Sequence, residues 1–140
     1  MATLSHEIRI DAPRDRVYEA LSTREGLAGW YTATIDGDVV EGGEALFTFE
    51  EREPFRWRFV ELSPTEGAWW ECTAGPGDAK GSTVTFRLSD TSDGRTQVEV
   101  DHEGFDGLDG AVKTCNTLWG ILRGHLKAYS ETTVPSPAFA

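Results

Sequence analysis

The stretch that decides the fold is the apolar run Leu108-Asp-Gly-Ala-Val-Lys-Thr-Cys-Asn-Thr-Leu-Trp-Gly-Ile-Leu-Arg-Gly-His-Leu-Lys-Ala-Tyr129. Its large apolar residues recur at alternating steps of four and three, which places them on one face of an α-helix. They are Leu108, Val112, Cys115, Trp119, Leu122, Leu126 and Tyr129. Asp106 is the expected N-cap, and Pro135 and Pro137 mark the region where the helix must have ended. The chain is predicted to be organised around this one long helix.

Three glycines interrupt the helical pattern. Gly110, Gly120 and Gly124 each cost about 1 kcal/mol relative to alanine in a helix interior. Gly120 and Gly124 are four residues apart, so they clear one patch of the helix surface. This patch has two interpretations, which are close packing on another element and room for a ligand.

The composition indicates one globular domain. A chain of 140 residues with 39% apolar residues is long enough to bury a sizeable core. The formal net charge of −11 argues against nucleic acid and anionic membranes as partners, because both attract basic surfaces. The sequence has no apolar run near 18 residues and no basic segment followed by an apolar one at its start. We therefore expect a cytoplasmic protein.

The two cysteines do not form a spaced framework. Cys115 lies on the helix stripe and is expected to be a small core residue. Cys72 lies in a predicted strand without a neighbouring His or Cys that would complete a metal site. No cofactor or metal is predicted.

The rest of the chain alternates with a period of two. A first strand, 4–10, is followed by two short helices near 17–21 and 24–29. Six further strands are then predicted over 31–36, 45–50, 55–59, 68–73, 83–88 and 97–102. Their short connections imply antiparallel neighbours in a meander with one buried face. The single domain is expected to span 1–133, followed by a flexible tail, 134–140, which is expected to fray.

Several residues in this order resemble a known family. The segment Ile10-Asp-Ala-Pro-Arg-Asp-Arg-Val-Tyr-Glu-Ala-Leu21, followed by Leu27 and Gly29-Trp-Tyr31, resembles the opening of the activator of heat-shock protein 90 ATPase-like family. That family shows an Ile-x-Ala-Pro segment, a Val-(Trp/Tyr)-x-Ala-Leu helix and a downstream Trp. The Gly42-Gly43 turn and the apolar residues of the final helix also match. The similarity covers about residues 4–131.

The resemblance implies a fold rather than a function. It implies an α+β architecture, the helix-grip fold of the START and Bet v 1-like (SRPBCC) superfamily. In that fold a curved antiparallel seven-stranded sheet wraps around a long C-terminal helix, which closes a cavity over the sheet. The superfamily contains carriers, cyclases, hydrolases and co-chaperone domains, so the fold does not choose among them.

The residues expected to line this cavity are mostly aromatic. They are Phe47, Phe49, Trp57, Phe59, Phe86, Val100, His102, Trp119, Gly120 and Leu122. Such a set has two interpretations: it suits a flat apolar ligand through ring stacking, or it simply fills the core. Trp69 and Trp70 must split across the two faces of their strand unless a bulge intervenes, so one indole is expected to face outward or an interface.

Histidines are the candidates for polar chemistry. His102 is in phase with Val98 and Val100, and a buried imidazole there would orient a ligand or act as an acid or base. The alternative is a hydrogen-bonded histidine at a strand end. His6 has a similar position in the first strand, whereas His125 flanks the helix stripe.

Three functions follow from these observations. The leading hypothesis is the binding of a small hydrophobic molecule, aromatic or lipid-like, between the helix and the sheet. The second is a cyclase-like or hydrolase-like enzyme that uses His102 or His6 as a general base in the same cavity. The third is a chaperone-associated interaction domain, for which the chain would be a lone domain. Monomer and homodimer both remain open.

Overall fold

The structure is a computed structural model that describes residues 2–50, 52–107 and 110–139. Seven antiparallel strands form one sheet in the order β1-β7-β6-β5-β4-β3-β2. The strands are β1 Ala2–Ile10, β2 Thr34–Gly37, β3 Glu44–Thr48, β4 Phe55–Ser63, β5 Gly67–Ala74, β6 Thr83–Asp90 and β7 Thr96–Phe105. The helices are α1 Arg14–Ser22, α2 Arg24–Trp30, the 3-10 turn η1 Gly77–Ala79 and α3 Ala111–Thr132.

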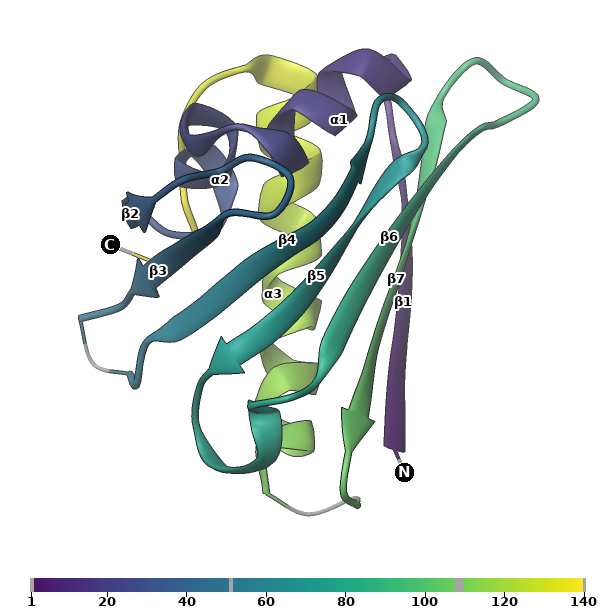
Figure 1. The fold of residues 1–140 in the computed structure, drawn as a ribbon. Coiled ribbons are helices and arrows are strands. Elements are labelled where there is room, and N and C mark those ends of the chain that lie inside the picture. Colours follow the sequence, from purple (N-terminus) through teal and green to yellow (C-terminus); the bar gives the residue numbers. More distant parts are fainter. Residues whose placement is uncertain (1, 51, 108–109, 140) are drawn as a thin grey trace.

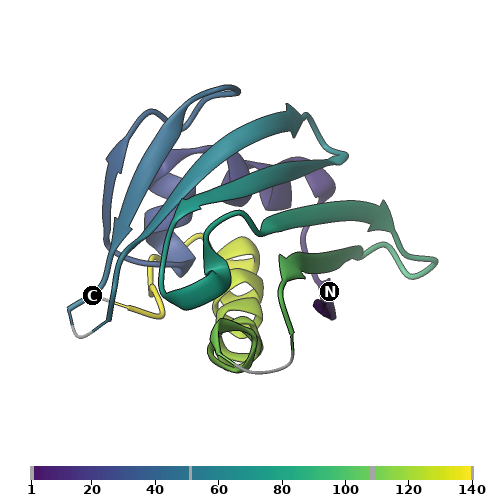
Figure 2. The same cartoon turned by 60° about the horizontal axis from the view of Figure 1, so that its bottom comes forward.

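The sheet curves around α3, which lies against its concave face (Figures 1 and 2). Helices α1 and α2 connect β1 to β2 and lie together near one end of α3 (Figure 1). This arrangement confirms the predicted α+β helix-grip fold with two short helices after the first strand. Within the described part of the chain, no helix has the length and apolar character needed to cross a membrane.

Alternation along β4 shows why the sheet has one buried face. Phe55, Trp57 and Phe59 point towards α3 and are at most 3% exposed, whereas Arg56 and Arg58 are exposed on the outer face. On that face the arginines meet carboxylates of neighbouring strands, in the pairs Arg56–Glu44, Arg58–Glu71 and Arg87–Asp101. The period of two in the sequence therefore separates an aromatic face from an ion-paired one.

Helix α3 carries the predicted apolar stripe, but its first turn is held differently from the prediction. Val112, Cys115, Trp119, Leu122 and Leu126 are all buried; Leu108 lies outside the described residues. The N-cap position is Gly110, which has no side chain to accept a hydrogen bond. Instead, Asp78 of η1 reaches across and its Oδ1 accepts from the Ala111 amide at 3.1 Å.

Asp106, the expected cap, is itself held by Asp78. The Asp106 backbone amide donates to Asp78 Oδ2 at 3.2 Å, so one carboxylate binds both the segment before the helix and the helix start. A carboxylate at this end also interacts favourably with the helix dipole.

The prediction of a frayed tail differs from the structure. Residues 134–139 run back along the end of α2, where the Ser136, Ala138 and Phe139 amides donate to Gly29, Trp30 and Tyr31 carbonyls. The Phe139 carbonyl accepts from the Ala33 amide at 3.1 Å, and its ring packs edge-on against Phe49 with centroids 5.2 Å apart. Composition indicated disorder, but the extended tail satisfies carbonyls that helix α2 leaves free at its C-terminal end.

Candidate functional site

The residues expected to line a cavity meet in the interior between α3 and the sheet. Nine of the ten are buried: Phe47, Phe49, Trp57, Phe59, Phe86, Val100, His102, Trp119 and Leu122. The aromatic rings among them contact one another and the buried Trp70, with centroid distances of 4.7 Å for Trp70–Phe86 and 5.7 Å for both Trp57–Trp70 and Phe86–Trp119. The expected walls thus form one aromatic cluster in which the side chains fill much of the space between helix and sheet.

Gly120 is not part of this interior. It is exposed on α3, as is Gly124, and a Cβ atom added at either position would meet no atom within 4 Å. The two glycines therefore neither permit close packing nor border a cavity. Their place follows from helix phase, because Leu118 and Leu122, also four residues apart, occupy the opposite, buried face.

His102 is held by a buried hydrogen-bond network. The Trp119 indole Nε1–H donates to His102 Nδ1 at 3.0 Å, so Nδ1 carries no proton. His102 Nε2 then carries the proton and donates to Ser82 Oγ at 2.7 Å. The Ser82 hydroxyl in turn donates a hydrogen bond to the Ala79 carbonyl at 2.5 Å. One tautomer of the neutral ring is fixed, and both of its nitrogens are occupied.

This network removes His102 as an acid or base near neutral pH. Burial lowers the pKa of His102 from 6.5 to about 3, because a charged imidazolium would lose its hydration. Protonation at Nδ1 would also break the Trp119 hydrogen bond. The interpretation of His102 as a hydrogen-bonded histidine therefore fits the geometry better than the general-base interpretation.

The aromatic cluster contains two indole donors that make no hydrogen bond of normal geometry among the described residues. These are the Nε1–H groups of Trp57 and Trp70, both on side chains at most 1% exposed. Two other buried indoles differ, since Trp30 donates to the Ala20 carbonyl at 2.7 Å and Trp119 donates to His102. Tyr31 belongs to the same cluster through Phe47 and Trp119, and burial raises the pKa of its phenol well above the usual range. The Trp57 indole lies beside this phenol and opposes part of the rise in its pKa.

The other candidate residues lie apart from this cluster. His6 Nε2 pairs with Asn116 Oδ1 at 3.0 Å across β1 and α3, and His125 Nδ1 donates to the Ser136 carbonyl at 2.8 Å. Burial raises the pKa of Cys72 to about 11 and that of Cys115 to about 12, so both thiols stay protonated at neutral pH. The described residues contain no group of three or more His, Cys, Asp or Glu placed to hold a metal ion.

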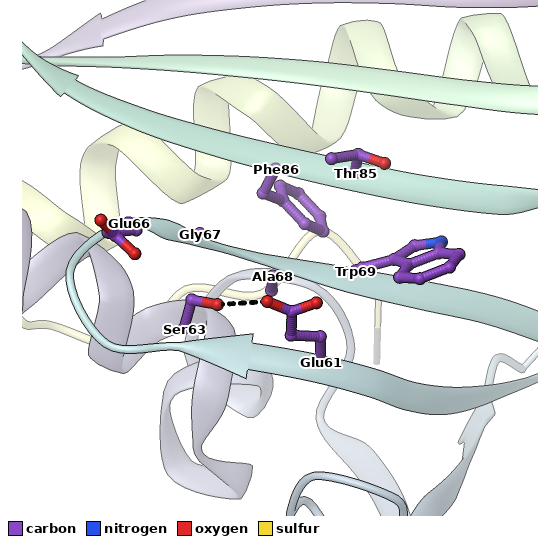
Figure 3. A pocket seen from close by; sticks show the side chains of 8 residues that line it. All are labelled: Glu61, Ser63, Glu66, Gly67, Ala68, Trp69, Thr85 and Phe86. Atoms are coloured by element: carbon purple, nitrogen blue, oxygen red, sulfur yellow. Dashed lines mark hydrogen bonds between the residues drawn. The ribbon is translucent and has the colours of Figure 1, made fainter.

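A second feature lies at the β4–β5 hairpin, where a pocket of about 290 Å³ opens (Figure 3). Its lining residues are Glu61, Ser63, Glu66, Gly67, Ala68, Trp69, Thr85 and Phe86. Trp69 stands on the outer face with 43% of its surface exposed, whereas Trp70 is fully buried. The doublet therefore splits across the sheet as predicted.

The sequence did not predict every residue of the interior aromatic cluster or of the pocket at the β4–β5 hairpin. It assigned Tyr31 to a weak strand and left open which of Trp69 and Trp70 faces inward, and it did not connect Ser82 with His102. The signal for the hairpin pocket was the Trp69–Trp70 doublet, because alternation forces one indole out. The pocket's Glu61 was not predictable, since a β-bulge between Phe59 and Glu61 sets it opposite Trp69.

Comparison with protein families gives one match over most of the chain. Residues 11–131 match the model of the family described as Activator of Hsp90 ATPase homolog 1-like protein. A search among curated proteins found no match.

Solved structures share the fold over almost the whole chain. The Aha1 dimer from Colwellia psychrerythraea has 27% identity and a TM-score of 0.83, with 94% of this chain and 98% of that chain covered. CalU16 from Micromonospora echinospora has 22% identity and a TM-score of 0.73, with 96% and 76% covered. DynU16, a putative protein in the dynemicin biosynthetic locus, has 22% identity and a TM-score of 0.76, with 95% and 48% covered. At such identities the last two share the fold alone.

Proposed function

Because the chain belongs to the Activator of Hsp90 ATPase homolog 1-like family, whose fold sets one long helix against a curved sheet, we propose that it binds a small molecule between α3 and the sheet. The molecule is flat, apolar and neutral, and it carries at least one hydrogen-bond acceptor such as a carbonyl oxygen. This is the leading hypothesis from the sequence, made more specific by the polar atoms of the interior.

The observation that carries the proposal is a pair of poorly satisfied indole donors among the described residues: Trp70 has no acceptor, and Trp57 has only the Tyr31 phenol beside it, without a hydrogen bond of normal geometry. A buried N–H group that lacks a partner costs about 1–3 kcal/mol, so native interiors rarely keep two of them side by side. Trp57 and Trp70 are neighbours, with ring centroids 5.7 Å apart. A carbonyl oxygen has two lone pairs and would satisfy such donors from a single guest molecule.

The surroundings favour a neutral, aromatic guest. The cluster around the two donors consists of aromatic rings, the neutral phenol of Tyr31 and the neutral imidazole of His102. An ionised group placed there would lose its hydration without gaining a counter-charge. Flat rings, in contrast, gain from stacked and edge-on contacts with the cluster. Because the cluster is already packed, the ligand must displace at least one ring on entry.

The enzyme hypothesis has less support than ligand binding. Its main candidate base, His102, has both nitrogens occupied and a pKa of about 3. His6 pairs with Asn116 at the partly exposed edge of β1 and lies outside the aromatic cluster. The interior therefore favours binding over acid–base chemistry.

The test compares neutral bicyclic and tricyclic aromatic ketones with the matching hydrocarbons that lack the carbonyl. Indole N–H signals in nuclear magnetic resonance spectra report directly on the donors. We expect a binding ketone to move the Trp57 and Trp70 signals strongly and the Trp119 signal weakly, because Trp119 already donates to His102.

A Trp70→Phe variant keeps an aromatic ring and removes one donor. It should weaken ketone binding by about fivefold to tenfold and leave hydrocarbon binding nearly unchanged, as loss of one hydrogen bond predicts. Equal affinity for ketones and hydrocarbons, or indole signals that respond to no compound in either series, would contradict the proposal. In the latter case buried water would be the better explanation of the two donors.

A further inference from the structure

The hairpin pocket combines an exposed indole with carboxylates on the outer face of the sheet. Glu61 lies directly opposite Trp69 on β4, and Thr85 lies opposite it on β6. Figure 3 shows these side chains coming from three adjacent strands, with Glu66 at the turn between β4 and β5. The pocket is thus formed by one aromatic surface with an acidic rim.

A glycine at the start of β5 forms part of the pocket lining near Trp69. Gly67 packs closely against β6, because an added Cβ atom would lie only 1.9 Å from the Phe86 carbonyl oxygen. A side chain at this position would force the two strands apart, so this part of the lining consists of backbone.

The carboxylates of the acidic rim form no ion pair between described residues. Arg14 of α1 reaches the hairpin, but its guanidinium donates to the Thr65 carbonyl at 3.3 Å and pairs with Asp90 at 3.0 Å. On the outer face Arg58 pairs with Glu71 at 3.6 Å and Arg87 with Asp101 at 2.6 Å. Glu61 accepts a hydrogen bond from Ser63 at 2.8 Å, and neither Glu61 nor Glu66 takes part in an ion pair between described residues. Negative charge here remains available to a partner.

We infer that this pocket is a docking site for an arginine side chain on a basic segment of a partner protein. A planar guanidinium stacks on an indole face through a cation–π contact and forms forked hydrogen bonds with a carboxylate. Trp69 provides the face, and Glu61 provides the carboxylate directly across from it.

The size of the pocket and the net charge of the protein both fit an arginine side chain. A volume of about 290 Å³ lies at the lower limit of small-molecule pockets, which suits one side chain of a partner better than a large ligand. The net charge of −11 attracts a basic segment from a distance and repels an acidic one.

The experiment measures binding of a fluorescent hexa-arginine peptide to the full chain by anisotropy, with hexa-lysine as a probe of equal charge. Trp69→Thr removes the aromatic surface from an exposed strand position and should weaken hexa-arginine binding roughly tenfold. Glu61→Gln keeps the shape of the rim but removes its charge, and it should weaken hexa-arginine binding about fivefold. Hexa-lysine should bind the wild-type chain several-fold more weakly than hexa-arginine, because an ammonium group cannot stack or fork.

Glu7→Gln is the matched control, because it removes the same charge from an exposed position on β1, three strands away from β5. It should change affinity by less than about twofold. If Glu7→Gln weakens binding as much as Glu61→Gln, or if Trp69→Thr has no effect, attraction to net charge alone explains the binding and the inference is overturned. Equal affinity for the two peptides would overturn it as well. Neither result bears on the interior ligand, so the two proposals fail separately.

Discussion

His102 accepts a hydrogen bond at Nδ1 and donates one at Nε2, so protonating this ring requires the Trp119 hydrogen bond to break. Its pKa is about 3 in the folded chain and 6.5 in a model peptide. The unfolded chain therefore binds the extra proton more readily. Stability from the neutral ring is fully present above pH 6.5 and is lost as the pH falls towards 3.

This linkage predicts an acid-sensitive fold. Between pH 7 and pH 5 the free energy of unfolding should fall by about 2 kcal/mol on account of His102, since each pKa unit corresponds to about 1.4 kcal/mol. A His102→Gln variant should be less stable at pH 7 by about 2–3 kcal/mol, and its stability should vary less over this range. Urea unfolding at pH 7, 6 and 5 measures both quantities.

The control is His6→Gln, which changes a half-buried histidine at the edge of β1. It leaves the network of Ser82, His102 and Trp119 intact, so an equal loss of pH dependence in this variant would contradict the assignment to His102. Parallel curves for the wild-type chain and His102→Gln would show that the buried ring does not govern the acid response, and the assigned tautomer network would then be wrong.

At the scale of elements, α3 depends on a residue outside its own sequence. Asp78 accepts hydrogen bonds from the Ala111 and Asp106 amides, so Asp78→Ala should destabilise the fold by about 1–2 kcal/mol. Asp106→Ala removes the carboxylate that the sequence indicated as the cap, but it leaves the backbone bond to Asp78 in place. It should cost less than about 0.5 kcal/mol. Thermal unfolding of both variants decides between the two caps, and a larger loss for Asp106→Ala would contradict the structure.

The elements of the fold were predictable from the sequence, but the residue that caps α3 was not. Helix α3 and the strands were predictable because each carries its own hydrophobic period, as Trp119 and Leu122 do on the helix and Trp57 and Phe59 do on β4. Asp78 was not, because it lies more than 30 residues before the amide it caps and no local pattern connects them.

In the candidate sites too, local periodicity predicted which residues are buried but not the contacts between distant segments of the chain. Aromatic residues of the interior were predictable from alternation, but the state of His102 depends on β7, α3 and the loop before β6 meeting at one point. The two indole donors of Trp57 and Trp70 became notable only when every nearby acceptor was known. Periodicity thus predicts which residues are buried, whereas hydrogen bonding between distant segments determines what they can do.

The C-terminal tail connects elements that are far apart in the chain, and its contribution to the whole molecule is measurable. Ending the chain after Thr133 removes hydrogen bonds to α2, the His125–Ser136 bond and the contact between Phe139 and Phe49. We expect this deletion to lower the free energy of unfolding by about 2 kcal/mol and Phe139→Ala alone to lower it by about 1 kcal/mol. Hydrogen exchange should quicken at the Ala33 amide, which donates to the Phe139 carbonyl, but only in the deletion variant, because alanine keeps that carbonyl. Unchanged stability together with unchanged exchange at Ala33 would mean that the tail is frayed in solution, as its composition alone predicts.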